Sequence, residues 1–308
     1  MKISVVSPVY LAENIVKELV KRITEEVTKL TDDYEIVLVD DCGPDNSWQK
    51  IKEQCELNER VKGIRLSRNF GQHPAIKAGV QNSTGDVVII MDCDLQDDPV
   101  YMKELIAEYD KGNEIVYTYK DKRAHGWFKN MTSYIFAKIF SWLVDNKSVD
   151  YNRNIGAYSL ISRRVADHFV SFPDYKFHYL IVLRWLGYQS SYVKIAHHER
   201  FEGKSSYTLS KLLERAFEGI VYQSNKLLKT SVFFGFFLAF CALIYALVIV
   251  VNYFYLEDVP TGWSSLATLI LFLSGIILIF IGILGAYIGS VFEQVKNRPQ
   301  YIIKEIIN

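Results

Sequence analysis

Residues 87–99 read Val-Val-Ile-Ile-Met-Asp-Cys-Asp-Leu-Gln-Asp-Asp-Pro, an apolar run followed at once by an acidic one. A short run rich in β-branched residues predicts a buried strand over Val87–Met91. The acidic residues begin where this strand ends. Ligands of parallel α/β sheets bind beyond the carboxyl ends of the strands, so the acidic segment predicts a binding site at such an end.

Strand and helix patterns alternate on both sides of this segment, over residues 1 to about 200. This alternation predicts an α/β fold, with a mostly parallel sheet that helices cover on both faces. The expected strands are Ile3–Val9, Glu35–Val39, Val61–Leu66, Val87–Met91 and Ile115–Tyr119, and the expected helices are Glu13–Leu30, Ser47–Leu57, Pro74–Gln81 and Val100–Asp110.

The composition excludes several classes of protein. The 35 Lys and Arg residues balance the 35 Asp and Glu residues, so no net charge points to nucleic acid as a partner. The four cysteines have no metal-ligand spacing, and we expect free thiols in a reducing compartment rather than disulfides. The first residues form a strand pattern, and we expect no signal peptide.

Two C-terminal runs, Thr230–Leu256 and Val259–Phe292, contain no charged residue. Each exceeds the roughly 20 residues that cross about 30 Å of hydrocarbon, so we expect two transmembrane helices. Lys and Arg residues flank the outer ends of this hairpin, whereas its connecting loop has none. The positive-inside rule therefore predicts a two-pass protein of the cytoplasmic (inner) membrane, with both termini and the soluble domain in the cytoplasm.

Two further stretches, Trp127–Val144 and Tyr207–Leu228, mix apolar residues with Lys and Arg. They fit core helices packed on the sheet, and they also fit interfacial helices that lie on the membrane. The second stretch runs directly into a transmembrane segment, which favours the interfacial interpretation. An exposed amphipathic face and the glycines of the second span permit a homo-oligomer.

The acidic segment has the chemistry of a metal site. The carboxylates of Asp92 and Asp94 are spaced so that both can reach one hard cation. Mg²⁺ or Mn²⁺ prefers oxygen ligands, completes its shell with substrate phosphates and neutralises a diphosphate leaving group. The alternative is an acidic loop in which Asp97 or Asp98 caps the helix that begins near Val100. The preceding strand and the Asp-Asp-Pro ending favour the metal site.

Polar segments follow three other predicted strands. At a strand end, the Asp40-Asp41 pair can hydrogen-bond a base or ribose hydroxyls; the alternative is a simple turn, because Gly43 and Pro44 follow. The basic, glycine-containing loop in Arg65–His73 suits phosphate or sugar contacts. The third segment is Ser7-Pro8-Val9-Tyr10, followed by Glu13-Asn14.

In this order, the four segments resemble glycosyltransferase family 2 with its GT-A fold. More narrowly, they are similar to the polyprenyl-phosphate branch, which includes dolichyl-phosphate mannose synthase. Asp-x-Asp-Leu-Gln-Asp and Arg-Asn-x-Gly are typical of that branch, and Gly71-Gln72-His73 is similar to bacterial undecaprenyl-phosphate aminoarabinose transferases. The motifs cover roughly residues 1–210, and the two C-terminal spans extend the resemblance to the whole chain.

The resemblance implies a role for each matching residue. Asp40 and Asp41 would hold the base and ribose, while Asp92, Asp94 and Gln96 would surround the metal and the donor, with Asp94 catalytic. Arg200 and Lys204 would clamp the acceptor phosphate, although Lys204 equally fits an exposed surface charge. The remaining donor and acceptor contacts would come from Pro8, Tyr10, Glu13, Arg68, Asn69, Lys120, Arg123 and Ser205.

One segment departs from the branch, which often has Gly-Asp-Phe-Arg-Leu where this chain has Gly156-Ala157-Tyr158-Ser159-Leu160. The missing Asp is a candidate base, and Asp150, or Asn154 by a polar contact, is the substitute to consider. The loss is chemically tolerable, because a phosphate monoester has a second pKa near ~6 and needs little deprotonation.

The resemblance implies inverting transfer of a sugar from a nucleotide-sugar, UDP favoured over GDP, to undecaprenyl phosphate for cell-envelope glycan modification. A flippase and a downstream glycosyltransferase would be partners. The alternatives are a processive polysaccharide synthase and a non-catalytic scaffold that binds nucleotide-sugar. The expected parts are a catalytic domain (1–206), a juxtamembrane helix (207–229), a transmembrane hairpin (230–292) and a cytoplasmic tail (293–308).

Overall fold

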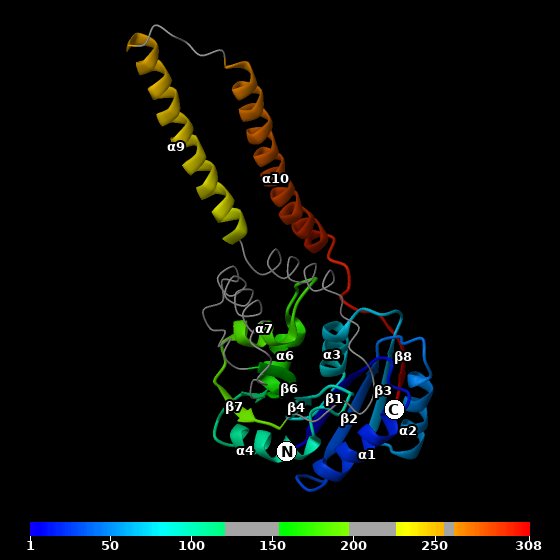
Figure 1. Ribbon diagram of the computed structural model, residues 1–308. Helices are drawn as coiled ribbons and strands as arrows, with labels where there is room; N and C mark the ends of the chain where they lie inside the picture. The colour runs from blue at the N-terminus through cyan, green and yellow to red at the C-terminus, as the bar shows by residue number, and fades with distance from the viewer. Residues whose placement is uncertain (121–153, 197–225, 256–261) are drawn as a thin grey trace. The chain divides into compact units, whose positions relative to one another are not determined.

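The computed structural model describes residues 1–120, 154–196, 226–255 and 262–308 (Figure 1). The chain forms two compact units. The first comprises Met1–His125, Ser148–Ser205 and Arg298–Asn308, and the second comprises Gly126–Lys147 and Ser206–Asn297. The amphipathic stretch Trp127–Val144 and most of Tyr207–Leu228 lie outside the described residues.

The first unit is built on an eight-stranded sheet of order β7-β5-β6-β4-β1-β2-β3-β8. The neighbours β4, β1, β2 and β3 are all parallel, while β6 runs antiparallel to β4 and β5, and β8 antiparallel to β3. The α/β fold with a mostly parallel sheet is therefore confirmed. The strands are β1 (Ile3–Val9), β2 (Tyr34–Asp40), β3 (Val61–Leu66), β4 (Val87–Ile90), β5 (Ile115–Lys120), β6 (Asn154–Ser162), β7 (Ser190–Lys194) and β8 (Ile303–Ile307).

Helices cover both faces of the sheet (Figure 1). One core cluster joins the sheet to α1 (Val16–Val27), α2 (Ser47–Leu57) and α4 (Met102–Tyr109). The other joins it to α3 (Gln72–Gln81), α6 (Arg163–Ser171) and α7 (Tyr179–Leu186). Coverage on both faces explains why β1 and β4 are buried at every position and read as continuous apolar runs.

A glycine sets the depth at which α3 packs on the sheet. A Cβ atom at Gly79 would lie 2.3 Å from Cγ1 of Val6 and 3.1 Å from Cγ2 of Val39. No side chain larger than hydrogen fits there without displacing the helix. The close packing fixes the N-terminus of α3 near the carboxyl edge of β4.

Several described elements were absent from the sequence expectations, namely α6, α7, β7 and β8. The most consequential is β8, because residues 293–308 were expected to form a cytoplasmic tail. The structure instead pairs Ile303–Ile307 with β3. This strand is only five residues long, and its partner lies more than 200 positions earlier, so no local pattern reveals the pairing.

The described part of the second unit consists of α9 (Lys226–Tyr255) and α10 (Trp263–Val295). Within them, Lys226–Tyr245 and Phe272–Val295 are long and apolar enough to cross a membrane, and neither is buried. Phe233 on α9, for example, is 76% exposed. A soluble protein does not leave apolar surface of this extent open to water, so the two helices are candidate membrane spans.

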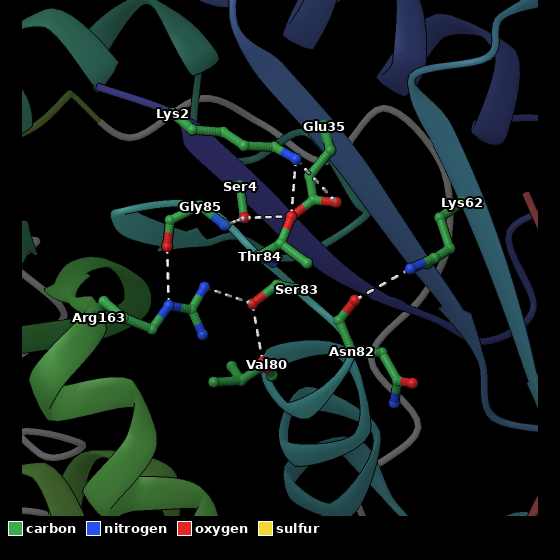
Figure 2. A network of polar contacts seen from close by, with 10 residues as sticks. All are labelled: Lys2, Ser4, Glu35, Lys62, Val80, Asn82, Ser83, Thr84, Gly85 and Arg163. Carbon is green, nitrogen blue, oxygen red and sulfur yellow. Dashed lines mark hydrogen bonds and ion pairs between the residues drawn. The ribbon is translucent and has the colours of Figure 1, made fainter.

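A polar network joins the amino ends of the strands in the first unit (Figure 2). The Glu35 carboxylate accepts hydrogen bonds from Ser4 Oγ (2.6 Å), Thr84 N (2.5 Å) and Thr84 Oγ1 (3.0 Å). Lys2 Nζ lies 3.9 Å from the same carboxylate. Arg163 extends the network to the helix layer by donating to the carbonyl of Gly85 at 2.8 Å. The network closes the edge of the sheet opposite the acidic segment.

We predict that Glu35→Gln destabilises the sheet unit in a pH-dependent way. Burial alone would raise the pKa of Glu35, but the hydrogen bonds from Ser4 and Thr84 and the charge of Lys2 outweigh it and leave the pKa below its usual value. The ionised side chain therefore adds stability above the unfolded pKa of about 4.3 and loses it as the pH falls through the folded value.

Thermal unfolding in detergent should show a loss of about 1–3 kcal/mol for Glu35→Gln at pH 7, and a smaller loss near pH 3.5. Glu25→Gln is the matched control, because its partner Lys21 is exposed and 3.9 Å away. An equal loss at both pH values would contradict the proposed role of the ionised carboxylate.

Candidate active site

The carboxyl ends of β1, β2 and β4 meet at one edge of the sheet, and each leads into a loop with an unusual backbone. Leu11, Cys42 and Leu95 follow these three strands and have positive φ angles of 52°, 54° and 54°. Apart from Asn297, they are the only such residues other than glycine in the described ranges. Each such conformation costs on the order of 1 kcal/mol or more and persists only where the surroundings enforce it, as in binding and catalytic sites.

The loops after β1 and β2 are tied to each other. The Asp45 carboxylate accepts from the backbone N–H of Glu13 (3.2 Å) and from Ser47 Oγ (2.6 Å). Asn46 N donates in return to Glu13 Oε2 at 2.9 Å. Glu13, expected to contact the donor, thus has a structural contact with the neighbouring loop. Of its two companions in that prediction, Tyr10 is exposed at the edge, whereas Pro8 is buried inside β1.

Asp41 shapes the basic loop after β3. Its two carboxylate oxygens accept from the backbone N–H groups of Phe70 (2.8 Å) and Gly71 (2.9 Å). Gly71 has φ 100°, a conformation open mainly to glycine, which explains its place in the loop. Arg68 and Asn69 are exposed beside this anchor, and the Arg68 guanidinium lies 4.3 Å from the centre of the Phe70 ring.

Asp40 points to the other face of the sheet and is completely buried. Its Oδ2 lies 3.3 Å from Arg65 Nε, and its Oδ1 accepts a long hydrogen bond from Gly43 N at 3.4 Å. Burial raises the pKa of Asp40 to about 6, although Gly43 and Arg65 oppose the shift. Asp40 therefore underlies the turn at Cys42 rather than facing open solvent.

The acidic segment after β4 concentrates negative charge. Asp92 Oδ1 accepts from Gln72 Nε2 at 2.6 Å, which links it to the N-terminus of α3. Burial, together with the charges of Asp94 and Asp97, raises the pKa of Asp92 to about 6. Asp94 Oδ1 accepts from the backbone N–H of Gln96 at 3.1 Å, which holds the turn at Leu95. Both Asp92 and Asp94 are half-buried.

The end of the segment is neutralised and capped within the protein. The Lys120 ammonium contacts the buried Asp97 carboxylate, with both side chains almost inaccessible. Lys120 was expected to face a phosphate, and that contact stays a prediction. Asp98 caps the short 3₁₀ turn η1 (Pro99–Tyr101) by accepting from Val100 N at 3.0 Å, so the capping alternative holds for this residue.

The site suits an oxygen-bound cation that shares its ligands with a substrate. In the described ranges, no three His, Cys, Asp or Glu side chains gather closely enough to hold a metal ion. Asp92 and Asp94 nevertheless offer two half-buried carboxylates two residues apart, and hard cations prefer such oxygen ligands. Burial raises the pKa of the Cys93 thiol to about 12, so without a metal ion the thiol is neutral near pH 7.

Of the predicted residues that precede Lys120, the structure thus places Tyr10, Asp41, Asp92, Asp94 and Gln96 at this edge, with Arg68 and Asn69 in the loop that Asp41 anchors, whereas Pro8 and Asp40 are buried and Glu13 contacts a neighbouring loop. The structure adds Gln72 and Arg65, which the sequence offered only as parts of a basic loop. Their signal was weak, because a glutamine or arginine beside a carboxylate is visible only once the strands are in register. Arg123, Asp150, Arg200, Lys204 and Ser205 lie outside the described residues, so their assignments stay predictions.

Comparison with known proteins settles the family. A model described as "Glycosyl transferase family 2" matches residues 4–169, more than half of the chain. This chain belongs to glycosyl transferase family 2. An uncharacterized glycosyltransferase of Bacillus subtilis, YkcC, is 31% identical over 98% of this chain and 93% of its own length. The SfII prophage-derived bactoprenol glucosyl transferase of Shigella flexneri is 32% identical over 99% of this chain and 98% of its own.

A solved structure shares the fold of this family 2 glycosyltransferase. It is the glucosyl-3-phosphoglycerate synthase of Mycobacterium tuberculosis, in complex with Mn²⁺, UDP-glucose and phosphoglyceric acid. The match covers 71% of this chain and 77% of that one, with a TM-score of 0.51 and 18% sequence identity. The expected GT-A fold and glycosyltransferase class are confirmed.

We predict that Asp41 holds the basic loop of this glycosyltransferase in place. Asp41→Ala removes the acceptors of the Phe70 and Gly71 amides, and a hydrogen bond to a charged group contributes about 1.5–3 kcal/mol. Hydrogen–deuterium exchange of peptides covering residues 67–72 should accelerate by about tenfold or more. Asp167→Ala removes an exposed carboxylate on α6 and should leave this loop unchanged. Equal protection of the loop in both variants would contradict the role of Asp41.

Proposed function

We propose that this glycosyltransferase moves one sugar from a nucleotide-sugar, with a UDP-sugar favoured, to polyprenyl phosphate at the cytoplasmic face of a membrane. The observation that carries the proposal is the occurrence, in one chain, of the acidic edge and of two unburied apolar helices. A relative named for action on bactoprenol, a polyprenyl alcohol, aligns over 99% of the chain, the helices included. The product would be a lipid-linked monosaccharide.

The donor half of the site would lie along the ends of β1, β2 and β4. Asp92 and Asp94 would hold Mg²⁺ or Mn²⁺, which supplies positive charge for the departing diphosphate. The Gln72 amide orients the Asp92 carboxylate by its 2.6 Å hydrogen bond. Asp41 presents Arg68 and Asn69 at the edge through the loop that it anchors, where a cation and an amide can bind phosphate or ribose oxygens.

The acceptor needs positioning more than it needs a base. A phosphate monoester is largely dianionic at neutral pH, so its oxygen can attack the anomeric carbon directly as the donor diphosphate leaves. A single in-line displacement of this kind inverts the anomeric configuration. Because such a displacement needs no strong base, it is compatible with Ala157 in β6, where the branch often has Asp. Asp150 stays a candidate base, and Arg200 and Lys204 stay candidate clamps for the acceptor phosphate.

The topology of the sheet supports a membrane hairpin that crosses twice. β8 follows α10 in the chain, yet it pairs with β3 in the sheet whose other strands precede α9. A chain that leaves one domain and returns to it must cross the membrane an even number of times. The Lys and Arg residues beside the hairpin ends then favour the cytoplasm for this domain.

The test is the mass of the lipid product made by the full-length protein in sealed membrane vesicles. The vesicles contain short polyprenyl phosphate, and a panel of UDP- and GDP-sugars is added outside with Mg²⁺ or Mn²⁺. Inside-out vesicles should add one hexose or amino-sugar unit to the lipid phosphate, and right-side-out vesicles should not, because nucleotide-sugars do not cross the bilayer. Asp94→Ala should lower turnover by about 100-fold or more, because it removes a ligand of the cation that stabilises the departing diphosphate.

Each other outcome contradicts a different part of the proposal. A polymeric product would identify a processive synthase. Activity only in right-side-out vesicles would show that the catalytic domain faces the opposite side of the membrane. Near-normal turnover of Asp94→Ala would remove the metal assignment. Nucleotide-sugar binding without any lipid product would favour a scaffold over an enzyme of this specificity.

A further inference from the structure

The strand β8 carries a charged residue, Glu305, that lies in line with charged residues of β3 and β2. Glu305 lies opposite Arg65 in the antiparallel register of β8 and β3. Arg65 in turn lies opposite Asp40 in the parallel register of β3 and β2. Three neighbouring strands thus carry a row of alternating charges, Glu305, Arg65 and Asp40, which we call the charge ladder.

The helix α2 fixes the outer end of the charge ladder. Lys52 Nζ lies 2.9 Å from Glu305 Oε1, and Trp48 Nε1 donates to Glu305 Oε2 at 3.2 Å. The Trp48 ring is near two cations, with Arg65 5.8 Å and Lys52 5.4 Å from its centre. Two side chains of α2 therefore hold Glu305, one by an ion pair and one by a hydrogen bond.

The inner end of the charge ladder has an unusual geometry. Arg65 Nε and Asp40 Oδ2 are 3.3 Å apart, close enough for an ion pair, yet neither atom has a hydrogen-bond partner in the described structure. Both atoms are buried. An arginine that faced Asp40 alone would align with it and form the stronger, directional bond. Arg65 also lies opposite Glu305, and its charge helps lower the pKa of that carboxylate, so Arg65 has a carboxylate on each side.

We propose that Glu305 is a positioning residue for donor binding: it holds Arg65 away from full pairing with Asp40 and so fixes the turn that follows β2. The proposal rests on the proposed function, because that function places the nucleotide at this turn. It also assigns a role to the chain after the membrane hairpin, which returns to complete the support of the donor edge. The Gly43 N–H that Asp40 accepts is the link between the charge ladder and the turn.

The side chains around Asp40 define how the effect can be measured. Arg65 on β3 lowers the pKa of Asp40, while Asp45 and Asp41 on its own loop raise it, against a background of burial. Glu305 and Lys52 act on this group through Arg65. Without the Glu305 charge, Arg65 interacts with Asp40 as its only carboxylate partner in the charge ladder. The pKa of Asp40 should therefore fall.

The experiment compares Glu305→Gln with Glu53→Gln in the full-length protein in detergent. Gln keeps the acceptor for Trp48 and removes only the charge. Glu53 is the matched control, because it pairs with Lys50 on α2 at 2.9 Å and belongs to no ladder. The readouts are the Kd for UDP in the presence of Mn²⁺, the KM for the UDP-sugar, kcat, and the pH dependence of the Kd between pH 5 and 8.

For Glu305→Gln we expect the Kd and KM to rise about fivefold, with kcat within about twofold of wild type. The pH midpoint of UDP binding should move to lower pH. Glu53→Gln should match wild type in every readout. In an Arg65→Gln background, Glu305→Gln should add no further loss, because its effect passes through Arg65.

An unchanged Kd for Glu305→Gln, or a fivefold loss that persists in the Arg65→Gln background, would overturn the proposal. If the wild-type protein binds neither UDP nor GDP, the proposed function fails and the role in donor binding fails with it. The charge ladder itself is then judged by thermal unfolding without nucleotide. Non-additive effects of the Glu305 and Arg65 substitutions support the ladder, and additive effects refute it.

Discussion

Carboxylates crowded at one edge of the sheet are the constraint on which the rest of this structure depends. Asp40 ends β2 and Asp41 follows it, while Asp92, Asp94 and Asp97 follow β4. Burial raises the pKa of Asp40, Asp41 and Asp92. The fold offsets part of this charge with Arg65 and Lys120 and satisfies Asp41 with backbone amides. Asp92 and Asp94 lie together just past the end of β4, where burial and the charges of Asp94 and Asp97 raise the pKa of Asp92 to about 6.

Other parts of the domain fix the position of this edge, where the carboxylates repel one another. The network around Glu35 fixes the opposite ends of the strands, and Gly79 seats α3 so that Gln72 reaches Asp92. The backbone adopts positive φ angles at Leu11, Cys42 and Leu95, in the loops that form this edge. The last strand, β8, ties the chain that returns from the apolar helices to the same scaffold. The acidic edge and the strand that follows the candidate membrane spans therefore belong to one sheet.

Local patterns were sufficient to predict the elements that line the site. The strands Ile3–Val9 and Val61–Leu66 were predicted to the residue, because β-branched runs bounded by polar residues are local signals. The helix expected from Glu13 begins only at Val16, since Glu13 bonds to Asn46 instead. The pairings Gln72–Asp92, Lys120–Asp97 and Glu305–Arg65 join distant segments. They depend on strand order and register, which composition and periodicity do not encode.

The most direct test of the account is the linkage between metal and nucleotide binding, measured by calorimetric titration of UDP into the wild-type protein. If the charge on Asp92 and Asp94 calls for a cation shared with a diphosphate, Mn²⁺ should tighten UDP binding by about tenfold or more over EDTA, and UDP should tighten Mn²⁺ binding by the same factor. Equal UDP affinity in Mn²⁺ and in EDTA would contradict the central claim, since the acidic edge would then hold the donor without a cation.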